Sequence, residues 1–153
     1  MTGNHMTYEC LVCIIFDQRV CLPIGAIQGI FPLHCTTSVP CTERWVLGLG
    51  LRDNRVFTVV CPASKHNSNA VPIDAAKMLL NRPSGSDLNW ALRVDQVLGM
   101  ASIIVDMTRH HFNEEWTCPG DWFRPAKTSA GDEIVWLDPE AVSCSLARVG
   151  GNR

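Results

Sequence analysis

Short apolar runs separated by polar turns make up the first half of the chain. The runs are rich in branched and aromatic side chains and cover residues 11–16, 20–24, 26–31, 45–51 and 56–61. Such runs are typical of β-strands. Asp17 and Gln18 supply turn chemistry between the first two runs, and Asn54, which tolerates a left-handed conformation, lies in the polar break between the last two. The pattern therefore predicts two hairpins, with a polar loop at residues 36–40.

A polar segment at residues 62–72 divides the chain, because it contains almost nothing that could fill a core. We expect the boundary between two halves there. Beyond it, strands are predicted at residues 75–80, 90–95, 97–105 and 134–137, with a short strand near Trp122 inside a long loop at 108–127. The first two of these strands, joined by the turn residues 82–87, predict a third hairpin.

One helix is predicted, close to the C-terminus. Asp138 is its expected N-cap, Pro139 fits the first helical position because its missing N–H is not needed there, and the helix runs to about Ala147. Strands spaced about 8 to 12 residues apart, with a single helix, favour small antiparallel barrels or a sandwich.

Composition and charge exclude several classes of protein. The 153 residues are 46% hydrophobic and 18% charged, which provides for a buried core and argues against disorder. Thirteen Lys and Arg against fifteen Asp and Glu give a net charge of -2 without a basic stripe, so nucleic-acid binding is not expected. The apolar runs are far shorter than the ~20 residues of a membrane helix, and we expect a soluble protein.

Eight cysteines are unusual for a chain of this length, and they lie at positions 10, 13, 21, 35, 41, 61, 118 and 144. A disulfide scaffold would follow a signal peptide, which the polar residues 1–6 do not resemble, and a structural zinc site would need a second close ligand pair besides Cys10 and Cys13. If these two lie on one strand, they point to opposite faces. We therefore interpret the cysteines as small buried hydrophobes in a reducing cytoplasm, with no metal site.

Groups that could carry out catalysis are not arranged convincingly. Gly48 and Gly50 lie inside a predicted strand and lack the following helix of a phosphate-binding loop. The adjacent pairs Glu114-Glu115, His110-His111 (with Cys118 seven residues on) and His34-Cys35 fit surface loops better than an acid, base or nucleophile. We expect neither enzymatic activity nor a cofactor.

Several strands carry more apolar residues than one sheet face needs. Residues 11–16 and 45–51 are apolar on both faces. Either two barrels pack against each other, or part of this surface binds another protein, and both can hold together.

Seven segments of the chain form a recognisable series. In the first half they are Leu11-Val12-Cys13-Ile14-Ile15-Phe16, Val20-Cys21-Leu22-Pro23-Ile24-Gly25-Ala26-Ile27, Val39-Pro40, Trp45-Val46-Leu47-Gly48 and Val56-Phe57-Thr58-Val59-Val60. In the second half they are Ala91-Leu92-Arg93-Val94-Asp95-Gln96-Val97 and Ile134-Val135-Trp136-Leu137-Asp138-Pro139-Glu140. In their order and spacing these segments resemble the CheW-like domain family, and the last two are similar to its Gly-Leu-x-Val-Asp-x-Val strand and its closing Leu-Asp-x-Glu segment.

The resemblance covers about residues 8–147 and implies an all-β fold of two packed five-stranded antiparallel β-barrels with a short C-terminal helix. We expect the first barrel at about residues 20–62 and the second at about 75–137, with exchanged terminal segments. Residues 1–7 and 148–153 are expected to form flexible tails.

The same resemblance implies a function in chemosensory signalling. Members of this family are non-catalytic adaptors that couple the cytoplasmic tip of methyl-accepting chemoreceptors to the regulatory domain of a CheA-type histidine kinase. The implied location is the cytoplasm, with recruitment to membrane-bound receptor arrays. The implied partner-binding positions are Ile27, Gly29, Gly48, Arg52, Asp53, Asn54 and Met100.

Three positions depart from the family pattern. Gly29 replaces an acidic residue, Thr58 replaces a proline, and the arginine of the family's Asn-Leu-Arg-Gly turn, aligned without gaps, falls on Asp53. A changed charge at a contact surface changes which partner fits. The sequence therefore suggests a divergent adaptor, serving for example surface or pilus-driven motility.

Two other functions remain open from the sequence. The cysteine count also fits a thiol-based redox or metal-binding protein. Alternatively, the domain binds only one array partner and sequesters it.

Overall fold

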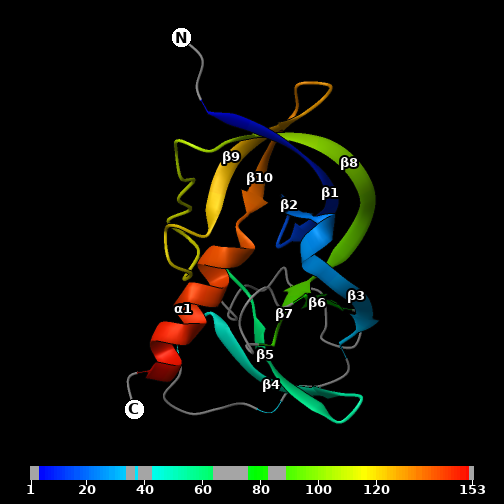
Figure 1. The fold of residues 1–153 in the computed structure, drawn as a ribbon, viewed down its shortest axis with the longest axis vertical. Coiled ribbons are helices and arrows are strands. Elements are labelled where there is room, and N and C mark those ends of the chain that lie inside the picture. Colours follow the sequence, from blue (N-terminus) through cyan, green and yellow to red (C-terminus); the bar gives the residue numbers. More distant parts are fainter. Residues whose placement is uncertain (1–3, 34–36, 38–42, 64–75, 83–88, 152–153) are drawn as a thin grey trace.

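The computed structural model describes residues 4–33, 37, 43–63, 76–82 and 89–151. These residues form two five-stranded sheets and one C-terminal helix (Figure 1), which confirms the expected fold class. Outside the described residues lie most of the predicted loop at 36–40, most of the linker at 62–72, all of the turn at 82–87 except Arg82, and Cys35, Cys41 and the segment Val39-Pro40.

The first sheet closes into a barrel. Its strands are β1 (His5–Ile15), β2 (Gln18–Pro23), β8 (Gln96–Asp106), β9 (Phe123–Thr128) and β10 (Glu133–Leu137), in the order β1-β2-β10-β9-β8. The predicted hairpin of β1 and β2 is confirmed, and Phe16 and Asp17 form its two-residue turn with φ of 46° and 70°. We call this unit the barrel.

The second sheet consists of the intervening strands. It contains β3 (Ile27–Pro32), β4 (Val46–Arg52), β5 (Arg55–Val60), β6 (Lys77–Asn81) and β7 (Trp90–Val94), in the order β3-β6-β7-β5-β4. A short 3-10 helix, η1 (Ile24–Ala26), joins it to β2. The predicted hairpins β4–β5 and β6–β7 are confirmed by antiparallel pairing.

The chain is divided between the two units differently from the expected boundaries at 20–62 and 75–137. Strands β6 and β7 return to the sheet of β3, β4 and β5, so the polar segment after β5 is a connection within one unit. The chain enters the second sheet through η1 and returns to the barrel at Asp95, between β7 and β8. Composition indicates where a chain is polar, but it does not indicate which strands pair.

Two strand pairings are parallel, which corrects the expectation of purely antiparallel sheets. Strand β10 pairs with β2 and β7 pairs with β5, each through a short parallel ladder. Each parallel pair joins an early hairpin to a later one within the same unit. The short ladders therefore complete both sheets.

Parts of both expected tails belong to regular structure. His5, Met6 and Thr7 extend β1 and pair with the far end of β8, because backbone hydrogen bonding in a ladder does not require apolar side chains. The helix α1 (Pro139–Gly151) continues past Ala147. Its start is confirmed, since Oδ1 of Asp138 accepts a hydrogen bond from the N–H of Glu140 at 3.0 Å.

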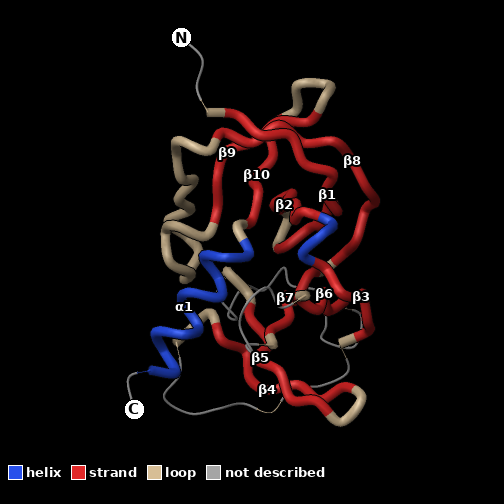
Figure 2. The backbone as a smooth tube through the Cα atoms, viewed as in Figure 1, coloured by secondary structure: helices blue, strands red, loops and turns tan. Residues whose placement is uncertain are grey.

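Buried side chains form three clusters. The interior of the barrel holds Cys10, Val12, Cys21, Ile103, Val105, Ala126, Ile134 and Trp136. The largest cluster joins the barrel, the second sheet and α1, and it includes Cys13, Val20, Trp45, Leu92, Trp122 and Val142. The third lies on the other face of the second sheet. Figure 2 shows α1 running alongside the strands of both units.

Four of the cysteines are buried, as expected for small hydrophobic side chains of the core. Cys10, Cys13, Cys21 and Cys61 are buried free thiols. Cys10 lies in the barrel interior and Cys13 in the joining cluster, so the two do point to opposite faces. Cys118 is half-buried and Cys144 is exposed.

Candidate functional site

The seven residues predicted to bind partners lie on both units. Ile27 and Gly29 are on β3, Gly48 and Arg52 are on β4, and Met100 is on β8. Asp53 and Asn54 form the two-residue turn between β4 and β5, with φ of 52° and 64°. The structure thus places six of the seven on the second sheet and one on the barrel.

The predicted residues differ in accessibility. Met100 is 71% exposed, whereas Ile27 is half-buried and packs against the joining cluster. Gly48 is buried at a register irregularity of the β4–β5 ladder and has a φ of 149°, a conformation that side chains rarely adopt. Gly48 therefore determines the local backbone path of β4, and it can contribute only backbone atoms to a binding surface.

The second half of β4 exposes its large apolar residues and buries its glycines. Leu49 and Leu51 point outward, with Leu51 70% exposed, while Gly48 and Gly50 point inward. A Cβ on Gly50 would lie 2.6 Å from the ring of Phe57, so the inward space is already filled. This arrangement reverses the usual one, in which a strand buries its apolar side chains.

Two exposed apolar faces result. One consists of Leu49 and Leu51 of β4 with the 59% exposed Val56 of β5, which is the cross-strand partner of Leu51. The other follows β8 and consists of Leu98, Met100 and Ile104. We call them the hairpin face and the β8 face. Sequence reasoning found only Met100 among these residues, although the two-sided apolar pattern of residues 45–51 was a signal for the first face.

Gly29 and Arg52 come together through Phe31, which sequence reasoning missed. A Cβ on Gly29 would lie 2.6 Å from the Phe31 ring, so the ring occupies the space beside that position. The guanidinium carbon of Arg52 lies 3.7 Å from the centroid of the same ring, which is a close cation–π contact. Because β3 and β4 are the two edge strands of the sheet, this contact bridges its edges.

Cavities open beside the Arg52–Phe31 contact. One of about 520 Å³ is lined by Leu49, Leu51 and Val56 together with residues at the end of β3. Another of about 390 Å³ is lined by Phe31, Arg55 and Asp53, among others. Arg52 and Phe57 line both cavities. The hairpin face is therefore hollowed and carries positive charge.

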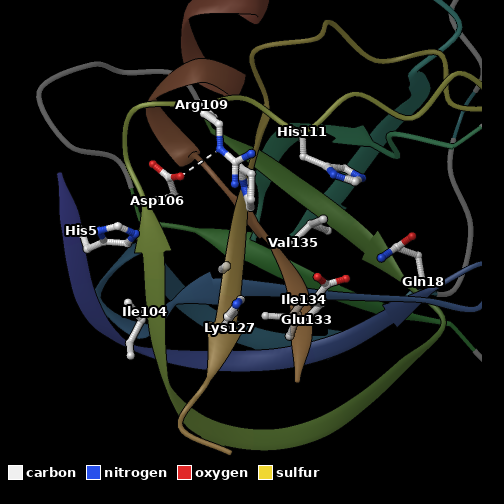
Figure 3. A pocket seen from close by; sticks show the side chains of 12 residues that line it. His5, Gln18, Ile104, Asp106, Arg109, His111, Lys127, Glu133, Ile134 and Val135 are labelled. Carbon is white, nitrogen blue, oxygen red and sulfur yellow. Dashed lines mark hydrogen bonds and ion pairs between the residues drawn. The ribbon is translucent and has the colours of Figure 1, made fainter. Parts of the chain in front are cut away.

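A third cavity, of about 640 Å³, lies on the barrel (Figure 3). Its lining includes His5, Asp106, Arg109 and His111. Asp106 accepts hydrogen bonds from the hydroxyl and N–H of Thr108 and from Nε of Arg109, and these bonds hold the pKa of its carboxyl well below the usual range. Asp106 is thus fully engaged as a carboxylate, and it is not poised to take up a proton near neutral pH.

Metal ligation is also not indicated among the residues that the model describes. No group of three or more His, Cys, Asp or Glu side chains in that part of the chain is arranged to hold a metal ion. Within the same residues, no helix is long and apolar enough to cross a membrane.

The buried thiols are held in their protonated form. Burial raises the pKa of Cys13 to about 12, that of Cys118 to about 12 and that of Cys61 to about 11. The pKa of Cys21 is also raised, through its hydrogen bond with Cys10 and through burial. A reactive thiolate needs a lowered pKa, so these four residues do not favour the thiol-based redox alternative.

Alkylation of individual cysteines tests this point. At about pH 8 in the native protein we expect iodoacetamide to modify the exposed Cys144, while Cys13 and Cys61 react only after unfolding, where thiols have a pKa of about 8.5. At about pH 10 nearly all thiols of the unfolded chain are deprotonated and should react quickly, whereas native Cys13, with a pKa of about 12, is still almost entirely protonated and is shielded by burial, so it should stay largely unmodified.

Mass spectrometry of proteolytic peptides identifies the modified residues, and a Cys144→Ser variant is the control for the native signal. Rapid modification of Cys13 or Cys61 in the folded protein would contradict the expected burial and would favour a redox function.

Comparisons with known proteins agree with this architecture. A family model described as the CheW-like domain matches residues 9–145. Among solved structures, the chain is similar to the scaffolding protein TtCheW from Thermoanaerobacter tengcongensis, with a TM-score of 0.60 and 16% sequence identity over 87% of this chain and 90% of that chain. No curated protein matches the chain. At this identity the structural likeness concerns the fold.

Proposed function

Because the chain belongs to the CheW-like domain family, we propose that it is a non-catalytic adaptor of a chemosensory array. In this role it couples the cytoplasmic tip of a methyl-accepting chemoreceptor to the regulatory domain of a CheA-type histidine kinase. The adaptor is located in the cytoplasm and is recruited to membrane-bound receptor arrays.

The observation that carries the proposal is the exposure of large apolar side chains on strands of both units. Leu51 and Met100 are each at least 70% exposed, and each has apolar neighbours on its own face. Contiguous exposed apolar surface on a stable domain marks sites of protein interaction. An adaptor that couples two proteins needs two such surfaces, and the hairpin face and the β8 face satisfy this need.

The proposed contacts include the positions implied by the family resemblance. Ile27, Gly29 and Met100 contribute apolar or backbone surface, and Arg52, Asp53 and Asn54 contribute the polar end of the β4–β5 hairpin. Gly48 supports the hairpin from within.

Two departures from the family pattern, at Asp53 and at Gly29, are explained by the local backbone conformation and packing. They support the proposal that the partners of this chain differ from those of typical family members. Asp53 and Asn54 both have positive φ, a conformation that Asp and Asn tolerate better than most residues, so the turn favours them over arginine. The Phe31 ring leaves no room for an acidic side chain at Gly29. We propose that the array served by this adaptor differs from the main flagellar one, for example in surface or pilus-driven motility.

Binding measurements with the purified chain test the proposal. The titrants are a receptor cytoplasmic fragment and a kinase regulatory domain from the same cell, each followed by isothermal titration calorimetry. We expect both to bind, and we expect Met100→Asp to weaken at least one interaction by about thirtyfold, as for a central interface residue.

Phe112→Asp is the matched control, since Phe112 is 64% exposed but lies in the loop after β8, outside both faces. If the wild-type chain binds neither protein, the proposed function is wrong although the fold stands. Binding to only one of the two would favour an adaptor that sequesters its partner.

A further inference from the structure

Arg52 is the most unusual charged residue of the hairpin face. Its guanidinium lies on the Phe31 ring, yet among the described residues no carboxylate lies within ion-pairing distance of it. Its Nε is buried and lacks a hydrogen-bond partner. The buried Nε is not accessible to a ligand, but a guanidinium that is fixed in position and has no carboxylate partner among the described residues can bind a planar anionic group through its Nη atoms.

The surroundings of Arg52 add positive charge and apolar surface. Arg55 is its cross-strand partner on β5 and lines the same cavity, whereas Asp53 is the one acidic residue among the described lining of that cavity. Leu51 and Val56, the most exposed apolar residues of the hairpin, lie next to the two arginines in sequence. The patch therefore combines net positive charge with an aliphatic surface.

The position of Arg52 is fixed by more than its own side chain. The Phe31 ring lies beside Gly29, the residue at which the family pattern has an acidic side chain, and only a residue without a Cβ leaves the ring where it is. The position of the Arg52 guanidinium thus depends on the Phe31 ring, and the position of the ring depends on the absence of a side chain at Gly29. The Phe31 ring and the Arg52 cation lie where the family pattern has an acidic group.

From this arrangement we propose that the hairpin face binds an acidic, apolar segment of a partner protein. A carboxylate of the segment accepts two hydrogen bonds from the Nη atoms of Arg52, and neighbouring aliphatic side chains cover Leu51 and Val56. The inference deepens the proposed function, because it names the chemistry that distinguishes the partner of this chain. A partner with a basic residue at this place is rejected, since like charges would meet across the interface.

The test uses two synthetic peptides, so that it does not depend on the identity of the array proteins. One alternates leucine with aspartate, and the other alternates leucine with lysine at the same length. Binding is followed in NMR spectra of the ¹⁵N-labelled full chain, in which the Nε–H of Arg52 is observed directly. We expect the aspartate peptide to shift this signal and the hairpin resonances, with an affinity about tenfold higher than that of the lysine peptide.

Two variants and a control complete the experiment. Arg52→Glu should invert the preference between the peptides, and Arg52→Gln, which keeps a polar side chain but removes the positive charge, should abolish it even if the first variant folds poorly. Arg19→Glu makes the same charge change on an exposed residue of β2 in the barrel and should leave the preference intact.

The outcomes separate this inference from the proposed function. The charge preference at Arg52 supports the inference even if the receptor fragment and the kinase domain do not bind. Equal binding of both peptides, or peptide contacts that map away from the hairpin, would overturn it even if both array proteins bind.

Discussion

Replacing Asp95 by alanine is expected to lower the free energy of unfolding by about 3 to 5 kcal/mol, as for other buried ion pairs that lose one partner. Asp95 lies between β7 and β8, at the crossing from the second sheet to the barrel. Its Oδ1 is 2.9 Å from Nη1 of Arg93, and both side chains are more than nine-tenths buried. Without the carboxylate, Arg93 stays buried but loses this ion pair.

The carboxylate also stabilises the turn between β1 and β2. Its Oδ2 accepts a hydrogen bond of 2.8 Å from the N–H of Phe16, a residue with a positive φ, and the N–H of Asp95 donates to the carbonyl of Ile14. A non-glycine residue in this conformation persists only when its surroundings hold it. The loss of Asp95 should therefore loosen the turn as well as the ion pair.

Urea-induced unfolding followed by circular dichroism measures the effect. Asp95→Asn keeps an acceptor for the Phe16 N–H but removes the negative charge, so its cost isolates the ion pair. The control is Arg109→Gln, which removes the 69% exposed partner of the pair with Asp106 at the protein surface, where such pairs contribute little. A loss for Asp95→Ala no larger than that for Arg109→Gln would show that the buried pair is not a major source of stability.

The strands themselves could be predicted from the sequence because each is a short apolar run with turn residues at its ends. The β1–β2 hairpin and the helix start at Asp138 follow from local rules, whereas the turn lies one residue earlier than the expected Asp17 and Gln18, because Asp95, far along the chain, holds Phe16 at a positive φ. What could not be predicted in this way is which strands pair. The assignment of β6 and β7 to the second sheet depends on the joining cluster, to which residues far apart in sequence contribute.

The candidate site was predictable to a smaller extent. Arg93 and Asp95 are two residues apart on an extended segment, so their proximity could have been expected from strand alternation. The contact between Phe31 and Arg52 could not, because it joins strands at opposite edges of the sheet and depends on the curvature of the whole sheet. The exposure of Leu51 and Val56 likewise depends on which face of the hairpin the core covers.

The second large effect is expected for Trp122→Ala, which should lower the free energy of unfolding by about 3 to 5 kcal/mol, the usual cost of removing a fully buried tryptophan. Trp122 is completely buried just before β9, and its ring makes an edge-to-face contact with Trp45 at 5.0 Å between centroids. Its indole N–H donates to Oγ of Ser145 on α1 at 2.9 Å. One side chain therefore joins the barrel, the second sheet and the helix.

A matched pair of variants separates packing from hydrogen bonding at this position. Ser145→Ala leaves the ring in place but removes the acceptor of a buried N–H, which should cost about 1 to 3 kcal/mol. If Trp122→Ala destabilises the protein no more than Ser145→Ala, then the ring does not have the proposed structural role. Urea titrations of both variants under the same conditions provide the comparison.

The position of Trp122 also connects stability with the proposed function. The hairpin face and the β8 face lie on different units, and a partner that contacts both requires a fixed orientation between them. Removing the ring creates a cavity where the units meet. A Trp122→Ala protein that is still folded should therefore lose more affinity for a partner protein that contacts both faces than for the aspartate peptide, which contacts the hairpin face alone. Calorimetric titration of both ligands at a temperature well below the unfolding midpoint measures this difference, and equal losses for the two ligands would show that the orientation of the units does not control binding.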